Sequence, residues 1–350
     1  MTGDLRWVLA GVAAAVVGMT VVIVLVRAAR HRRERHRAAL TAGPRRELLA
    51  FAADGDDPAP LLALPAPVWR ELLPTAVRLL GQVRGDARAG LVDLLLRRGL
   101  ADEALADLRG RGAARRAAAA QTLGDLAVAQ PPIVAALSRA LRDPDADVRA
   151  AAVRALGHVG DPAAVAPLLA ALTGRARLPA ILVADALSAL DAAAEPEIVA
   201  AIGHADPLVR MTVLDALRVR RAVTAARAAV AVLDGDPVPD VRRVAATALG
   251  VLGGRSAVPP LVEVASSGAA PPLRAAAAVA LGELGARAAV PALVRLLADP
   301  GYEVASAAAE SLARLEPDGV RALRVAAGTD GPGRAYAAQS LALAELRAAR

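Results

Sequence analysis

Residues 143–172 read DPDADVRAAAVRALGHVGDPAAVAPLLAAL, and this stretch decides the fold. An Asp-Pro pair opens each half, at Asp143-Pro144 and Asp161-Pro162. Apolar residues after each pair recur at intervals of three and four, which is the periodicity of an amphipathic helix. Asp is a favoured helix cap and Pro suits the first helical turn. The stretch therefore predicts two consecutive helices, the first ending at Leu156-Gly157.

This helical hairpin recurs along the chain with a nearly constant period. Leu156 belongs to a series of eight leucines spaced 29 to 33 residues apart. Each is preceded by a small residue, and Ala or Val stands four residues before it. The residue seven positions before the leucine is Arg in six of the eight units, and we expect it to face water or a neighbouring unit. The leucines are Leu123, Leu156, Leu187, Leu217, Leu249, Leu281, Leu312 and Leu341, and the arginines are Arg116, Arg149, Arg210, Arg242, Arg274 and Arg334.

Helix boundaries recur in step with the leucines. Asp-Pro pairs at residues 143, 236 and 299, with a slightly displaced pair at Asp206, are expected to cap the first helix of their units. Leu-Gly at 123, 156, 249 and 281 is expected to end that helix. A second helix is expected to begin near Pro132, Pro162, Pro196, Pro259, Pro291 and Pro317.

The pattern in residues 143–172 resembles the short HEAT repeat, of the subtype also seen in phycobilin lyase subunits, and the units around Leu249 and Leu281 match nearly as well. The resemblance covers residues 113–350 and implies an all-α fold, an α-solenoid of HEAT-like superhelical type. In HEAT proteins the second helices generally line the concave face. Arg139, Glu263 and Arg295 share one column of the second helices and are the candidate contacts with a partner. The alternative for these three residues is an ordinary solvated helix face.

The N-terminal segment predicts a single transmembrane helix over residues 7–26. These 20 residues carry no charge and span about 30 Å as a helix, which is the hydrocarbon thickness of a bilayer. Residues 1–6 precede the segment, and a basic juxtamembrane collar over 27–37 follows it. The collar arginines are expected to touch anionic lipid headgroups, and they are Arg27, Arg30, Arg32, Arg33, Arg35 and Arg37.

This charge asymmetry predicts the orientation, because the positive flank of a transmembrane helix stays inside the cell. We expect a single-pass protein of the inner cell membrane with its N-terminus outside and its repeats in the cytoplasm. A cleaved signal peptide is the weaker alternative, since its positive charge would precede a shorter apolar core. Residues 38–67, rich in Pro, Gly and Asp, are expected to form a linker with one helix near 47–53, and residues 68–112 degenerate hairpins that cap the repeats.

Composition excludes several classes of chemistry. The chain has no Cys and no Lys, which removes disulfides, thiolate metal sites, thiol catalysis and lysine-based phosphate or Schiff-base chemistry. Five of the seven net positive charges lie within residues 1–37, so the repeats are nearly neutral and no nucleic-acid partner is expected. His158 and His204 fall in turns on opposite edges of the hairpins, and the segment from Asp54 lacks the glutamate that ends a calcium loop. No metal, cofactor or catalytic residue is predicted.

These observations predict a non-enzymatic scaffold or adaptor that is anchored in the membrane and binds a protein through its repeats. The alternative is a phycobilin lyase-like enzyme or its chaperone-like subunit, which the repeat subtype alone suggests. A solenoid offers a long surface and usually lacks a deep pocket, which favours the scaffold.

Overall fold

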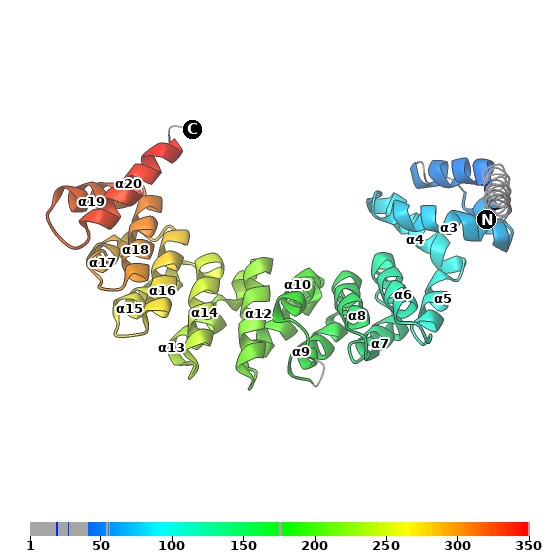
Figure 1. Ribbon diagram of the computed structural model, residues 1–350, viewed down its shortest axis with the longest axis horizontal. Helices are drawn as coiled ribbons and strands as arrows, with labels where there is room; N and C mark the ends of the chain where they lie inside the picture. Colours follow the sequence, from blue (N-terminus) through cyan, green and yellow to red (C-terminus); the bar gives the residue numbers. More distant parts are fainter. Residues whose placement is uncertain are drawn as a thin grey trace, which may run out of the picture. The chain divides into compact units, whose positions relative to one another are not determined.

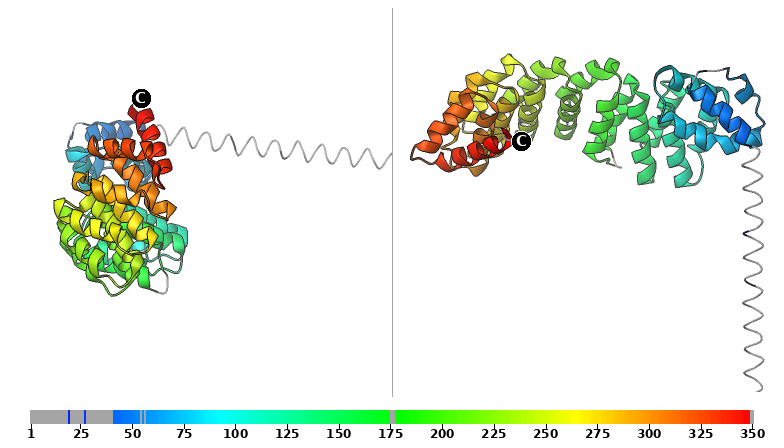
Figure 2. Two further views of the ribbon diagram at one scale, coloured as in Figure 1. Left: turned by 90° about the vertical axis from the view of Figure 1, so that its left-hand side faces the viewer. Right: turned by 90° about the horizontal axis from the view of Figure 1, so that it is seen from above.

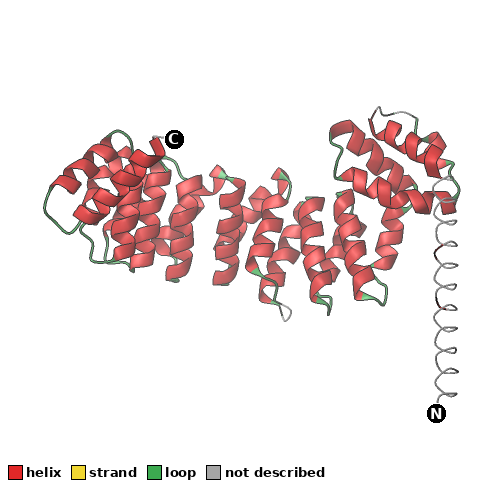
Figure 3. Cartoon of the chain, turned by 45° about the horizontal axis from the view of Figure 1, so that its top comes forward, coloured by secondary structure: helices red, strands yellow, loops and turns green. Residues whose placement is uncertain are grey.

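The computed structural model describes residues 41–348, apart from Asp54, Asp56, Arg175 and Ala176, together with the isolated Met19 and Arg27. The predicted transmembrane helix and basic collar thus lie outside the described residues, except for Met19 and Arg27, whose side chains are exposed. Within the described part of the chain, no helix combines the length and the apolarity that crossing a bilayer requires. All regular structure that is described is helical (Figure 3).

The chain divides into two compact units, residues 1–104 and 105–350. In the first unit, residues 41–53 are helical, followed by α2 (Ala59–Leu62), α3 (Ala66–Leu80), α4 (Gly85–Arg97) and the start of α5 (Leu100–Asp107). Arg98 lies 4.5 Å from the centre of the Trp69 ring and donates hydrogen bonds to the carbonyls of Leu62 and Leu64. This arginine therefore ties α3 to the turn that precedes it.

The linker was expected over residues 38–67, and the described part of it, from residue 41 onward, contains helices. The helix at 41–53 is longer than the 47–53 that the sequence suggested, and it buries Leu48 and Phe51. Leu61 of α2 is also buried. Pro44 lies within the helix at 41–53 and Pro60 within the first turn of α2, so the prolines of this segment do not prevent helix formation.

The second unit is a succession of helical hairpins (Figure 1). The first helices form one layer in which each contacts the next, and the second helices form another layer. Figure 2 shows the same succession from two further directions. The first helices are α6 (Ala113–Leu126), α8 (Ala146–Val159), α10 (Ala180–Ala189), α12 (Pro207–Arg220), α14 (Pro239–Leu252), α16 (Pro271–Glu283), α18 (Tyr302–Arg314) and α20 (Arg334–Ala348).

The second helices begin close to the predicted prolines. Short 3-10 turns precede several of them, which lets the chain reverse direction within a few residues. The second helices are α7 (Pro131–Ala140), α9 (Val165–Thr173), α11 (Glu195–Ala200), α13 (Ala226–Gly235), α15 (Val258–Ser266), α17 (Val290–Leu296) and α19 (Asp318–Gly328).

The leucine series forms the seam between the two layers. The first seven of its members, Leu123 to Leu312, are fully buried, and Ala or Val four residues earlier is buried beside each one. Burying a leucine contributes about 1.5–3 kcal/mol relative to leaving it exposed. The regular spacing thus places one such contribution in each hairpin, and the all-α solenoid predicted from the sequence is confirmed.

The Leu-Gly pairs do not end the first helices, contrary to the prediction. Gly124, Gly157, Gly250 and Gly282 all lie inside helices that continue past them. A Cβ at Gly124 would lie 2.7 Å from Cα of Ala155, and a Cβ at Gly282 would lie 2.7 Å from Cβ of Ser311. The glycines are therefore contact points at which the next first helix presents the small residue that precedes its leucine. Only hydrogen at this position allows the two helices to approach so closely.

The Asp-Pro pairs also differ from expectation. Asp206 caps α12 as predicted, by accepting the amide of Leu208. Asp143, Asp236 and Asp299 instead lie three residues before the first residue of their helices, and each accepts the amide two residues further on. The side chains of these three aspartates stabilise the turn between successive hairpins.

Gly124→Ala tests the close contact. Alanine favours a helix by about 1 kcal/mol over glycine, but here its methyl group would overlap Ala155, and overpacking costs typically 1–3 kcal/mol. We expect amide hydrogen exchange in α6 and α8 to become faster by roughly tenfold. The control is Gly235→Ala, because Gly235 ends α13 with nothing within 4 Å of its Cβ position. Unchanged or slower exchange in Gly124→Ala would contradict the role assigned to this glycine.

Candidate functional site

Grooves open between successive second helices of the second unit. The second helices contact one another less extensively than the first helices do, because only the first layer has the glycine contacts. Three grooves of about 500 to 620 Å³ lie in this layer, between α17 and α19, between the end of the α11 region and α13, and between α7 and α9. Their volumes fall within the usual range for ligand sites, about 300–1,000 Å³.

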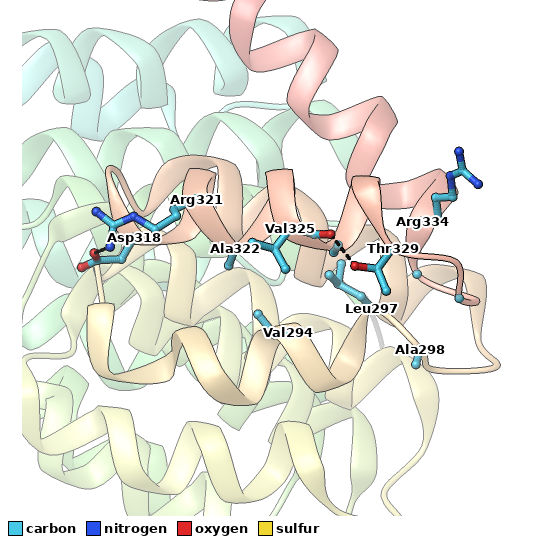
Figure 4. A pocket seen from close by; sticks show the side chains of 12 residues that line it. Val294, Leu297, Ala298, Asp318, Arg321, Ala322, Val325, Thr329 and Arg334 are labelled. Carbon is cyan, nitrogen blue, oxygen red and sulfur yellow. Dashed lines mark hydrogen bonds and ion pairs between the residues drawn. The ribbon is translucent and has the colours of Figure 1, made fainter.

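The groove between α17 and α19 is mainly apolar (Figure 4). Val294, Leu297 and Ala298 form one wall, and α19 supplies Ala322 and Val325 to the other. Val325 is 65% exposed, so the groove presents an apolar side chain to solvent.

Charged pairs stand at the edges of this groove. Nη1 of Arg321 lies 3.5 Å from Oδ1 of Asp318, and Nη1 of Arg334 lies 2.5 Å from Oδ1 of Asp330. Thr329 closes one end by donating a hydrogen bond to the carbonyl of Val325 at 2.8 Å. An apolar floor between charged rims is the arrangement that accepts the apolar face of a partner helix or an extended segment.

The groove between the α11 region and α13 contains an ion pair that links two neighbouring hairpins. Arg210 of α12 donates from Nε and Nη2 to the two carboxylate oxygens of Asp236, at 2.7 and 2.8 Å. Both side chains are less than 10% exposed. The Nη1 atom of Arg210 donates at the same time to the carbonyls of His204 and Ala205. This arginine therefore fixes the turn before its own helix and the turn before the next unit.

The same ion pair recurs in two further places. Arg116 binds Asp143 through Nε and Nη2, and Arg274 binds Asp299 through its two terminal nitrogens. Each pair joins the arginine of one hairpin to the aspartate of the Asp-Pro pair that precedes the next hairpin. Sequence reasoning identified both columns but did not pair them. The available signal was that an arginine stands 25 to 27 residues before each of these aspartates.

These contacts lower the pKa of the aspartates. The pKa of Asp143 is held below its ordinary value mainly by the Arg116 hydrogen bond. For Asp236 and Asp299, burial alone would raise the pKa, but the arginine and a backbone amide together outweigh burial and the net shift is downward. The carboxylates are therefore charged throughout the neutral range.

The groove between α7 and α9 contains one of the predicted contact residues. Arg139 lines it together with Arg142, Ala170 and Gly174. The Arg139 side chain is exposed, and its Nε donates to the carbonyl of Ala135 within the same helix.

The other two predicted contacts are also exposed residues of second helices. Glu263 lies on α15 and Arg295 on the neighbouring α17. Among the described residues no ion pair joins them, and neither lines one of the three grooves described above. The structure thus places all three residues in the second-helix layer without gathering them into one site.

Comparison with known proteins agrees with this architecture. A family model for HEAT repeats matches residues 101–190, 226–313 and 258–342, which together make up more than half of the chain. The chain belongs to the HEAT-repeat family. No curated protein matches the sequence.

Solved HEAT-type solenoids resemble this chain at low identity. The karyopherin Kap121p, in a structure with the extreme C-terminus of the protein phosphatase Cdc14p, is 16% identical with a TM-score of 0.50. That match covers 87% of this chain but 41% of the karyopherin chain. The complex of CpcE and CpcF of phycocyanin lyase from Nostoc sp. PCC7120 is 24% identical with a TM-score of 0.33, covering 64% of this chain and 92% of that one. The likeness to the karyopherin shows the fold alone.

HEAT solenoids are generally scaffolds for protein interaction, and the expected HEAT identity is confirmed. The HEAT array here combines a tightly packed first layer with a grooved second layer. The three grooves described above therefore lie on the second helices and on the turns beside them.

The inter-unit ion pairs predict a specific response to acid. Because the aspartate pKa values are lower in the folded state, the stability that they supply is complete above the unfolded value of about 3.9 and is lost as the pH falls through the folded pKa.

Asp236→Asn should destabilise α12–α14 by about 1–3 kcal/mol at pH 7 and flatten the loss of stability below pH ~4. Hydrogen exchange at pH 7 and thermal melts between pH 3 and 7 measure both effects. The control Asp234→Asn alters a neighbouring carboxylate that takes no part in these ion pairs, and it should leave both unchanged. An acid response of Asp236→Asn equal to wild type would contradict the assignment.

Proposed function

We propose that this protein is a non-enzymatic scaffold, anchored in the inner membrane by residues 7–26, whose cytoplasmic HEAT solenoid holds a protein partner close to the membrane. The observation that carries the proposal is the apolar groove between α17 and α19, with Val325 exposed on its wall and charged pairs at its rims.

Several features support a protein as the ligand. The walls of this groove are aliphatic and small, so they match the side chains of an amphipathic helix better than a planar cofactor. The groove is one of a series along the second layer, which suits an elongated partner that contacts several units. In the Kap121p structure, a solenoid of similar fold binds the terminal segment of another protein.

The membrane part of the proposal rests on the sequence. Twenty uncharged residues precede a run of arginines, and this order favours retention in the bilayer with the repeats on the positive, cytoplasmic side. The enzyme alternative rests on the repeat subtype alone. No adduct on incubation of the full chain with a bilin and an acceptor protein would dispose of it.

Two cysteine variants test the topology, because the chain has no native Cys. Thr2→Cys should react with a membrane-impermeant maleimide in intact cells, since the N-terminus is placed outside. Ala42→Cys should react only after the cells are permeabilised, since the repeats are placed in the cytoplasm. Labelling of Ala42→Cys from outside, or recovery of both variants in the soluble fraction, would overturn the anchored topology.

Val325→Asp tests the groove. Burying an exposed valine in an interface contributes on the order of 1–2 kcal/mol, and a buried unpaired charge costs more. Crosslinking from native membranes should therefore capture the partner at least tenfold less efficiently with this variant than with the wild-type chain. The matched control is Val219→Asp on α12, where the valine is 51% exposed but belongs to the first layer. Equal capture by both variants would exclude the α17–α19 groove as the binding site.

A further inference from the structure

A cavity of about 570 Å³ in the first unit is lined by three arginines. Arg70 belongs to α3, Arg97 is the last residue of α4 and Arg98 follows it, while Trp69 and Leu73 of α3 supply apolar surface. More arginines line this cavity than line any of the three grooves of the second unit described above. The cavity is therefore a candidate site for an anionic ligand.

The guanidinium of Arg98 is held in place by the protein itself. Its Nη1 donates to the carbonyls of Leu62 and Leu64, at 2.9 and 3.0 Å, and its central carbon lies 4.5 Å from the centre of the Trp69 ring. In the described part of the chain, Nε and Nη2 of Arg98 make no hydrogen bond, and neither is a buried donor without a partner. Both nitrogens are therefore open to solvent, and a fixed guanidinium keeps two donors free for an oxyanion.

Arg70 and Arg97 add positive charge beside this fixed guanidinium. Both side chains are exposed, and no ion pair among the described residues engages Arg70. Nε of Arg97 lies 2.8 Å from Oδ2 of Asp93, but more than half of each of these two side chains is exposed. An ion pair in water is weak, so a bound anion can compete with Asp93 for Arg97.

Glu103 is the one carboxylate among the residues that line the cavity. It is exposed on α5, and within the described part of the chain no ion pair neutralises it. The three arginines against Glu103 and Asp93 leave a net side-chain charge of +1. Glu103 therefore opposes the binding of an anion, whereas Arg70 favours it.

We propose that this cavity binds a phosphate group, carried by an anionic lipid headgroup or supplied as free inorganic phosphate. A tetrahedral phosphate presents oxygens in several directions, so it can accept hydrogen bonds from more than one guanidinium at once, whereas a carboxylate presents two oxygens in one plane. The volume is in the range of small-ligand sites. The lipid source suits a unit whose described helices follow the uncharged stretch 7–26 in the sequence. The proposal goes beyond the proposed function, because the site is separate from the second-helix grooves and holds for either source.

Isothermal titration calorimetry with the full-length chain in a non-ionic detergent tests the site. The probes are sodium phosphate, glycerophosphoglycerol, which is the deacylated headgroup of phosphatidylglycerol, and sodium acetate. We expect saturable binding of a phosphate-bearing probe and no saturation by acetate over the same concentrations. Tighter binding of glycerophosphoglycerol identifies a lipid headgroup as the source, and tighter binding of sodium phosphate identifies the free anion.

Two variants with opposite expected signs make the test specific. Arg70→Gln should weaken binding at least fivefold, and Glu103→Gln should strengthen it about twofold or more, because it removes a repelling charge. The matched control is Arg78→Gln, an exposed arginine of α3 that does not line the cavity, and it should change the affinity less than twofold. Arg70 is exposed and unpaired among the described residues, so its replacement leaves the fold intact, which circular dichroism verifies. No saturable binding of either phosphate probe, equally tight binding of acetate, unchanged affinity in Arg70→Gln, or weaker binding by Glu103→Gln would each overturn the proposal.

Discussion

The close approach of successive first helices is the constraint on which the second unit depends. Gly124 lies against Ala155, and Gly157 lies against Ala186, at distances that leave no space for a Cβ on the glycine. Because these contacts join only the first layer, the second helices contact one another less extensively and leave grooves between them. The grooved layer is thus a geometric consequence of where the smallest side chains stand in each repeat.

The arginine and aspartate columns add a second level of organisation, and they vary along the array. Ion pairs such as Arg210–Asp236 join some units, while elsewhere glycine replaces the aspartate, as at Gly174 and Gly268. A missing ion pair removes a link between neighbouring hairpins. Variation within a repeat, rather than the repeat itself, therefore distinguishes one region of a HEAT surface from another.

The sequence predicted the repeating hairpins because the buried leucines recur with a fixed period, and burial depends on periodicity more than on context. It did not predict the role of Gly124, because a glycine near a helix end is a common stop signal and its neighbour lies about 30 residues away. Asp143 was predicted to cap a helix, because its partner Arg116 belongs to the preceding hairpin and lies 27 residues away in the sequence. The grooves could not be predicted, because their walls come from side chains such as Val294 and Val325 that meet only when two hairpins are stacked.

The central claim is that partners bind the second-helix layer. Its most direct measurement is photocrosslinking in native membranes, with benzoylphenylalanine placed singly at Arg139 and Val325 of the second layer and at Ile181 and Val219 of the first. All four side chains are exposed, so the positions differ mainly in the layer to which they belong. The account predicts crosslinks to a protein from Arg139 and Val325 and none from Ile181 and Val219. Crosslinks from the first-layer positions alone would contradict it.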